Sequence, residues 1–272
     1  MTKHFCVFGN PIAHSYSPFI HELFANQFGH ALSYRRQLAT EYNFASTVAR
    51  LFRQNLTGAN VTLPFKQQAF RLANTVTPEA RDAGAVNTLV ATAAHGLLGA
   101  NTDGLGLLYD LKRLNVDLSG KRVLLIGAGG AARGVLRNLL DEKPEVIWLY
   151  NRSPAKAEAL AAGRSRIKAV THWQPVTGVE LVINATSASL NGDLPAVPDS
   201  LLASSAVIYD MMYAATATPF IRHVQKIAEP ACYDGLGMLV GQAAESYRLW
   251  WNCELPQIDP VIQQVRQQLA AQ

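Results

Sequence analysis

The sequence predicts an α/β fold with mainly parallel sheets, divided between two domains. The chain has 272 residues, which is long for one compact domain and comfortable for two. Apolar residues make up 49% and charged residues 16%, a composition that supports a large core and argues against disorder. Short apolar runs alternate with longer stretches of helical periodicity, which is typical of βαβ units.

The first hundred residues open with an apolar strand that ends in a turn at Asn10-Pro11. Ser17 and Pro18 then begin a helix, because Pro suits the first helical position and a Ser side chain can cap it. Strands and helices alternate from there, and two strands around the turn 93–96 predict a hairpin. The predicted strands cover 4–9, 32–38, 58–62, 86–92 and 96–102, and the predicted helices cover 17–28, 42–54 and 64–74.

The rest of the chain repeats the alternation around a polar segment, 117–121, which is the candidate entry into a second domain. Asp103 begins a helix that ends near Asn115, before this segment. An apolar strand, a glycine turn and a helix then follow one another in 121–141. Further strands are predicted at 146–153, 167–170, 181–187, 206–213 and 231–235, with helices between them, and two closing helices at 236–251 and 256–272.

The charge and the hydropathy argue against nucleic acid and membrane as partners. The net charge is +4 with a pI near 9.0, and no run of five basic residues occurs, so a slightly basic surface is expected. A small anionic substrate or a phosphate cofactor would account for part of the excess equally well. No stretch of about 18 apolar residues and no long apolar leader occurs, so a cytoplasmic protein is expected.

The three cysteines, Cys6, Cys232 and Cys253, lie far apart in apolar surroundings and form no C-x-x-C pair. This pattern predicts buried thiols in a reducing compartment rather than a disulfide or a zinc site. The seven histidines add no metal-ligand spacing, so no metal is expected.

The glycine-rich segment 127–134 follows an apolar strand and opens an amphipathic helix. Glycines alone often do no more than make a turn. In this context, however, small residues let backbone N–H groups approach a pyrophosphate at the amino end of the helix. The expected cofactor-binding residues of this turn are Gly127, Ala128, Gly129, Gly130 and Ala131.

The end of the next strand predicts which dinucleotide is bound. An NAD enzyme would carry an acidic residue there for the ribose 2′-hydroxyl, but this chain reads Asn151-Arg152-Ser153 with Lys156 close behind. Arg and Lys favour a 2′-phosphate, and therefore NADP. The alternative is an ordinary solvated arginine at a strand end.

Several segments together resemble the shikimate dehydrogenase family, in order and over nearly the whole chain. The resemblance implies an open α/β substrate domain and a Rossmann-type NADP domain with a central cleft. The closing helices then return to the first domain, which gives 1–102 plus 236–272 for substrate and 103–235 for NADP. The matching segments are GNPIAHSYSP, GANVTLPFK, AVNT, NTDG, GAGGAARG, NRS, NATS, YDMMY with Thr218-Pro219, and DGLGMLVGQA.

The resemblance also implies a role for particular side chains. Lys66 and Asp103 match the catalytic pair, and Ser15 and Ser17 match the carboxylate binders at a helix amino end. The loop Ala214–Ala217 departs from the family, in which Pro, Lys or Gly is frequent. The implied substrate-binding residues are Ser15, Ser17, Thr62, Lys66, Asn87, Asp103, Tyr213 and Gln242, and Met212 and Gly235 are implied near the nicotinamide.

The implied activity is the reversible NADP-dependent reduction of 3-dehydroshikimate to shikimate, in aromatic amino-acid biosynthesis. The expected partner is this small molecule, and the expected assembly is a monomer or a homodimer. Three alternatives stay open: an NAD-linked quinate/shikimate dehydrogenase, a non-catalytic binding relative, and an unrelated Rossmann dehydrogenase. Arg152 argues against the first, the presence of both Lys66 and Asp103 against the second, and the first-domain motifs against the third.

Overall fold

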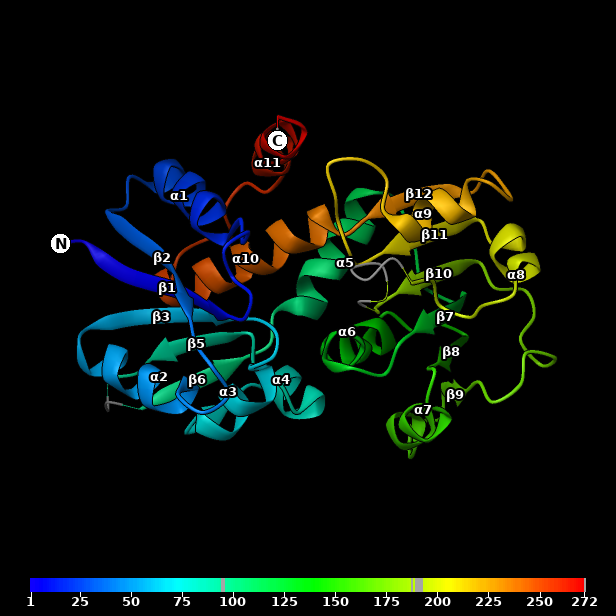
Figure 1. Cartoon of the computed structure of the whole chain (residues 1–272), viewed down its shortest axis with the longest axis horizontal. Helices are drawn as coiled ribbons and strands as arrows, with labels where there is room; N and C mark the ends of the chain where they lie inside the picture. The colour runs from blue at the N-terminus through cyan, green and yellow to red at the C-terminus, as the bar shows by residue number, and fades with distance from the viewer. Residues whose placement is uncertain (94–95, 187, 189–192, 272) are drawn as a thin grey trace.

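The computed structural model describes residues 1–93, 96–186, 188 and 193–271, which form two lobes side by side (Figure 1). Within these residues each lobe centres on one sheet of six strands, so the predicted α/β fold is confirmed. Parts of three predicted segments lie outside the described residues. They are Ala94 and His95 of the hairpin turn, Ser187 of the NATS motif, and Gln272 of the last helix.

The first sheet has the strand order β2-β1-β3-β5-β6-β4. Its centre is parallel, and the predicted hairpin runs antiparallel beside it. The two-residue strand in this sheet was not predicted, because so short a segment shows no alternation. The strands are β1 (Lys3–Gly9), β2 (Leu32–Leu38), β3 (Leu56–Val61), β4 (Thr75–Val76), β5 (Thr88–Ala91) and β6 (Leu97–Ala100).

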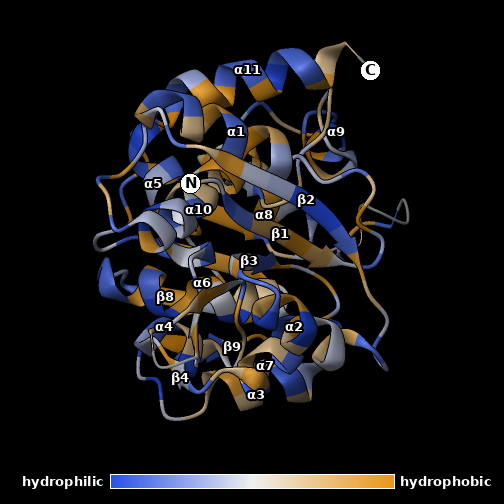
Figure 2. Cartoon of the chain, turned by 90° about the vertical axis from the view of Figure 1, so that its left-hand side faces the viewer, coloured by the Kyte–Doolittle hydropathy of each residue, from blue (hydrophilic) through white to orange (hydrophobic). Residues whose placement is uncertain are grey.

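Helices cover both faces of this sheet, and two of them come from the far end of the sequence. One face carries α1 (Ser17–Phe28), α10 (Leu236–Trp251) and α11 (Asp259–Ala270), which share one apolar core. Figure 2 shows α11 across the end of the lobe, with hydrophobic and hydrophilic residues alternating along it. The remaining helices of the lobe are α2 (Phe44–Arg53), α3 (Lys66–Leu72) and α4 (Pro78–Ala83), the last of which was not predicted.

The predicted cap of α1 is wrong. Ser17 is the first residue of the helix rather than its cap, and Tyr16 occupies the cap position with no side-chain cap bond. Ser15 takes over part of this role, because its Oγ accepts a hydrogen bond from the Ser17 N–H at 3.2 Å.

The second sheet is parallel throughout and has the order β12-β11-β10-β7-β8-β9. This is the order of doubly wound dinucleotide-binding sheets, in which ligands bind where the direction of winding reverses, here between β7 and β10. The strands are β7 (Arg122–Ile126), β8 (Val146–Tyr150), β9 (Ile167–Ala169), β10 (Leu181–Asn184), β11 (Val207–Asp210) and β12 (Ala231–Asp234). The helices are α6 (Gly130–Asp141), α7 (Pro154–Ala161), α8 (Asp199–Ser204) and α9 (Pro219–Val224).

Two helices cross between the lobes, α10 and α5 (Asp103–Arg113), and they pack backbone against backbone (Figure 1). A Cβ on Gly106 of α5 would stand 2.5 Å from the Gln242 nitrogen of α10, so glycine is required there. A Cβ added to Gly241 would likewise stand 3.0 Å from the Gly106 Cα and 3.1 Å from the Gly106 carbonyl oxygen. The crossing therefore fixes Gln242 relative to Asp103.

The cysteine prediction holds only in part. Cys6 on β1 is buried, whereas Cys232 and Cys253 are half-buried, and all three thiols are free. Cys232 lies on the edge strand β12 and Cys253 follows the end of α10, and both places leave a side chain partly open to solvent. No helix in the described ranges is both long and apolar enough to cross a bilayer.

Candidate active site

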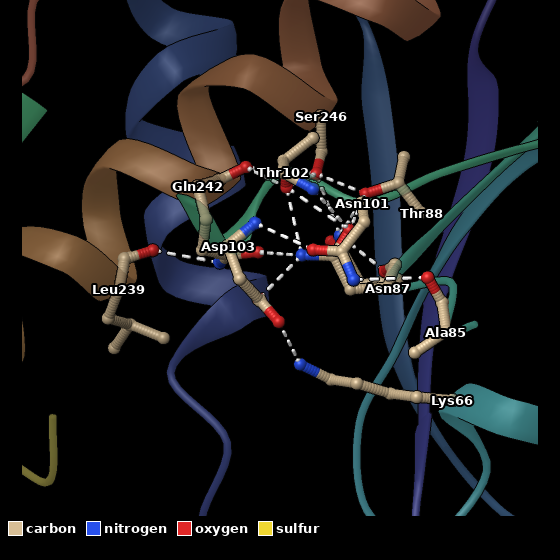
Figure 3. Close-up of polar contacts among 11 residues, drawn as sticks. Lys66, Ala85, Asn87, Thr88, Asn101, Thr102, Asp103, Leu239, Gln242 and Ser246 are labelled. Carbon is tan, nitrogen blue, oxygen red and sulfur yellow. Dashed lines mark hydrogen bonds and ion pairs between the residues drawn. The ribbon is translucent and has the colours of Figure 1, made fainter. Parts of the chain in front are cut away.

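Lys66 and Asp103 form an ion pair at the edge between the lobes. Lys66 is the first residue of α3, which begins two residues later than predicted, and buried Phe65 anchors that end of the helix by stacking on Phe44 with ring centroids 4.7 Å apart. The Lys66 Nζ donates to the Asp103 Oδ2 at 2.5 Å, with side chains 17% and 7% exposed (Figure 3). An ammonium group so close to a carboxylate can hold or move a proton at one defined point.

Asn87 fixes the other oxygen of Asp103. Its Nδ2 donates to the Asp103 Oδ1 at 2.8 Å, while its Oδ1 accepts from the Thr102 backbone N–H at 3.0 Å. Because a backbone N–H can only donate, this second bond sets which way the amide points. The Asp103 N–H donates to Asn101 Oδ1 at 3.1 Å. Both carboxylate oxygens therefore accept bonds, and Asp103 can orient a neighbouring group.

Gln242 reaches the same cluster from α10 (Figure 3). Its Oε1 accepts from the Asn87 Nδ2 at 3.2 Å, and its Nε2 donates to the Leu239 carbonyl at 2.8 Å. The structure thus brings together four of the predicted site residues, from α3, α5, α10 and the segment before β5.

A layer of buried hydroxyls lies behind this cluster. The Ser246 Oγ donates to the Gln242 carbonyl at 3.0 Å and lies 2.7 Å from the Thr88 Oγ1, which donates to Asn87 Oδ1 at 2.8 Å. Sequence reasoning missed both hydroxyls. Their positions in the sequence could have indicated them, because Ser246 stands one helical turn after Gln242 and Thr88 directly follows Asn87.

The layer ends in a buried histidine that the sequence did not single out. Asn60 donates to the Ser246 Oγ at 3.0 Å and accepts from the Tyr34 hydroxyl at 2.7 Å. Burial lowers the pKa of His21 to about 3, so its ring is neutral and its Nε2–H donates to Asn60 Oδ1 at 3.0 Å. Asn60 therefore ties α1 and α10 to the sheet.

Ser15 and Ser17 bond to each other at the start of α1. The Ser15 Oγ donates to the Ser17 Oγ at 3.1 Å, and Arg36 of β2 holds the Ser15 carbonyl with two bonds of 3.0 and 2.6 Å. Within the described residues neither serine bonds to the Lys66–Asp103 pair, nor does Thr62, which is half-buried just after β3.

The loop after β11 carries Met212 and Tyr213 toward the first lobe. Tyr213 meets Tyr16 edge to face with ring centroids 6.5 Å apart, and burial raises the pKa of Tyr213 to about 12, so its phenol is protonated at neutral pH. The Gly235 N–H donates to the Met212 carbonyl at 2.9 Å, so these two residues lie together. Met211 packs on the core of the second lobe.

The glycine turn has an open face. Gly127 has a φ of +112°, which favours glycine, and its N–H donates to the Tyr150 carbonyl at 2.7 Å. A Cβ on Gly129 or Gly130 would meet no atom within 4 Å, so space is open beside the amino end of α6, and half-buried Ala131 follows. The unpaired N–H groups of such a helix end suit a pyrophosphate.

Gly134 joins this helix to the ion pair. A Cβ on it would stand 2.9 Å from the Asp103 Oδ2, so α6 rests directly against the carboxylate. The sequence offered no reason for a glycine at this position, because the contact lies between segments about 30 residues apart. The nucleotide-type turn and the Lys66–Asp103 pair therefore belong to one site.

The segment after β8 fits a phosphate. Asn151 is half-buried; its Oδ1 accepts from the Ala128 N–H at 3.1 Å and its Nδ2 donates to the Ser153 carbonyl at 2.9 Å. Arg152 and Lys156 are exposed, and no carboxylate of the described residues pairs with either. Two free cations beside a dinucleotide turn can bind a 2′-phosphate.

Comparison with known proteins identifies the family. The chain is 47% identical to the shikimate dehydrogenase (NADP⁺) of Cellvibrio japonicus, over 99% of each chain, and 48% identical to that of Aeromonas hydrophila, over 90% and 91%. The chain belongs to the shikimate dehydrogenase family. Family models agree: the substrate-binding domain of shikimate dehydrogenase matches 7–89, shikimate/quinate 5-dehydrogenase matches 110–191, and the C-terminal domain of shikimate 5′-dehydrogenase matches 235–266.

Two solved structures have the same fold. Shikimate 5-dehydrogenase of Thermus thermophilus, in complex with NADP(H) and shikimate, is 31% identical with a TM-score of 0.87, covering 97% of this chain and 99% of its own. The ligand-free 5-ketofructose reductase of a Gluconobacter strain is 28% identical with a TM-score of 0.84, covering 98% and 99%. The fold is therefore compatible with more than one carbonyl substrate, and the residues of the site determine which substrate is bound.

Proposed function

We propose that the protein catalyses the reversible NADP-dependent reduction of 3-dehydroshikimate to shikimate, a step of aromatic amino-acid biosynthesis. The observation that carries this proposal is the contact of α6 with Asp103, which sets the glycine turn and the Lys66–Asp103 pair side by side. Family membership at 47% identity over almost the full chain supports the same reaction.

Lys66 and Asp103 are assigned the proton transfer. The amino end of α6 and Arg152 would hold NADP, which would supply the hydride acceptor for C3 of shikimate and, as NADPH, the hydride donor for the reverse direction. As the neutral amine, the Lys66 Nζ takes the proton of the C3 hydroxyl during oxidation and becomes the ammonium, which gives the proton back during reduction. Asp103, held by Asn87, keeps the lysine in place and offsets its charge.

The substrate is assigned to side chains of both lobes. Ser15 and Ser17 bind the carboxylate with their hydroxyls at the start of α1, where an anion is favoured. The ring hydroxyls of shikimate need donors and acceptors in a polar pocket, and amides and hydroxyls around the ion pair provide them. The residues assigned to these hydroxyls are Thr62, Asn87, Tyr213 and Gln242.

The cofactor is assigned to the second lobe. The amino end of α6, with Gly127 to Ala131, holds the pyrophosphate, and Met212 with Gly235 lies near the nicotinamide. Arg152 and Lys156 bind the 2′-phosphate, with Asn151 and Ser153 adding neutral hydrogen bonds.

The domain division 1–102 plus 236–272 and 103–235 is part of the proposal. The return of α10 and α11 onto α1 supports it, and so does the packing of Leu107 and Leu111 of α5 in the core of the second lobe. Assembly as a monomer or a homodimer and a cytoplasmic location stay predictions.

One assay tests the proposed function. Purified protein is mixed with shikimate or quinate and with NADP or NAD, all in one buffer, and the absorbance of the reduced nicotinamide is followed. We expect the highest kcat/KM with shikimate and NADP. A preference for NAD or for quinate would favour the NAD-linked alternative, and no turnover with any pair would favour the non-catalytic one.

A further inference from the structure

One arginine of α11 reaches from the first lobe to the second. Arg266 Nη1 donates to the Ala214 carbonyl at 3.0 Å and to the Asp234 Oδ2 at 2.8 Å, and its Nη2 donates to the Asp234 Oδ1 at 2.6 Å. Helix α11 is itself fixed, because Val261 and Val265 are fully buried against α1 and α10. The guanidinium group therefore stands on a rigid support.

The two partners of Arg266 lie where the chain leaves neighbouring strands of the second sheet. Ala214 follows β11, one residue after Tyr213, and Asp234 ends β12. The Asp234 Oδ1 also accepts from the N–H of Leu236, the first residue of α10, at 3.2 Å. Arg266 thus clamps the loop after β11 to the start of α10.

The loop after β11 packs against a pocket rather than against a filled core. Residues 215–217 line a pocket of about 380 Å³, together with Arg266 and Asp234. A segment over a hollow gains few packing contacts, so polar bonds decide its position. At the same residues, within Ala214–Ala217, this chain departs from the pattern frequent in the family.

We infer that Arg266 is a positioning residue for the proposed reaction: through the Ala214 carbonyl it holds Tyr213 against Tyr16, at the start of α1. The inference rests on the proposed function, in which Tyr213 contacts the substrate. Arg266 acts on the substrate end of the site only. The 2′-phosphate residues follow β8, which three strands separate from β12 in the sheet order.

Enzyme kinetics test the inference. We expect Arg266→Met, which keeps the alkyl stem, to raise the KM for shikimate about 3- to 30-fold with a smaller change in kcat, the usual range for residues that couple sites. Arg266→Lys, which keeps the charge and one donor nitrogen, should raise the KM for shikimate less than Arg266→Met does. The Kd of 2′,5′-ADP, a probe of the phosphate site alone, should not change.

Arg248→Met is the matched control. Arg248 of α10 pairs with Glu245 at 2.9 Å, with side chains 45% and 18% exposed, against 41% and 12% for Arg266 and Asp234. The Arg248→Met variant removes an ion pair about as exposed as Arg266–Asp234, but one that contacts no loop of the site. A rise of the shikimate KM in this variant equal to that of Arg266→Met would overturn the inference, because general destabilisation would then explain both.

Hydrogen exchange tests the clamp without activity. We expect the amides of 211–218 to exchange faster in Arg266→Met than in wild type, and at the wild-type rate in Arg248→Met. Unchanged exchange would overturn the inference whatever the KM does, since the loop would not carry the effect. If wild type fails to oxidise shikimate, the proposed function fails, and the exchange rates still decide whether Arg266 holds the loop.

Discussion

A single carboxylate, Asp103, meets groups from three separate segments of the chain. Lys66 comes from α3, Asn87 from the segment before β5, and Gly134 from α6. Replacing any one of these neighbours would change what the carboxylate faces. The predictions at this scale therefore concern single side chains whose charge the site uses.

We expect Lys66→Ala to lower kcat about 10²–10⁴-fold, because the group that exchanges the proton is lost while the substrate hydroxyls keep their other partners. Steady-state rates of NADP reduction measure the effect. Lys226→Ala, which removes an exposed lysine of the second lobe, is the control and should leave kcat unchanged. Near-wild-type turnover in Lys66→Ala would remove the lysine from the mechanism.

We expect Arg152→Ala to weaken NADP binding about 10–150-fold and to change NAD binding little. A charge-assisted hydrogen bond contributes about 1.5–3 kcal/mol, and only NADP carries the 2′-phosphate that receives it. Titration with both cofactors measures the two Kd values. Arg166→Ala, which also removes an exposed arginine of this lobe, is the control. Equal losses for NADP and NAD would rule out the phosphate assignment.

Asp210 makes stability depend on pH. Burial raises its pKa from 3.8 to about 6, despite bonds from Thr218, Met212 and Asn184. The folded state thus favours the protonated form, so this contribution to the free energy of unfolding is fully present below about pH 4 and is lost as the pH rises through 6. Its full size is about 3 kcal/mol, from a shift of roughly two pKa units.

Asp210→Asn cannot titrate, and this gives the test. We expect the Tm of wild type minus the Tm of the variant to be larger at pH 4.5 than at pH 7.5, measured by scanning calorimetry. The amide keeps an oxygen for Met212 and Asn184. A Tm difference that stays constant, or that grows with pH, would contradict the raised pKa.

At the scale of elements, the crossing of α5 and α10 sets the geometry of the site. Gly106 and Gly241 let the two backbones meet, and the same contact carries Gln242 toward Asn87. We expect Gly106→Ala to cost about 1–3 kcal/mol of stability through overpacking and to raise the KM for shikimate. Calorimetry and kinetics check both effects. Lys112→Ala, an exposed substitution on the same helix, should show neither.

Long periodic elements could be predicted from the sequence, and short ones could not. Helix α10 was predicted with the right bounds because its apolar spacing extends over 16 residues, whereas α4 has only 6. Lys66 and Asp103 were found because they lie in recognisable motifs. Ser246 was missed because a serine within an apolar helix shows no partner in the sequence, and its partners Asn60 and Thr88 lie more than 150 residues away.

At the scale of the molecule, the two lobes meet through α5, α10, the Tyr213 loop, Arg266 and the packing of α4 on α6, where Arg137 pairs with Asp82 at 2.7 Å. A site shared between two such bodies can close on its ligands and exclude water from the hydride path. We expect NADP and shikimate together to reduce the radius of gyration measured by small-angle scattering, more than either alone. An unchanged radius would mean that the site is already closed in the free protein.

The core formed by α1, α10 and α11 also bears on how the protein is made. Ile20 and Phe24 of α1 leave the ribosome early, but their partners Val240 and Tyr247 are more than 200 residues further along. Between them the ribosome produces all of the second sheet, so that lobe can fold as a unit while the first still lacks part of its core. Throughout that interval the apolar face of α1 lacks its partners on α10 and α11, and a chaperone could bind it there.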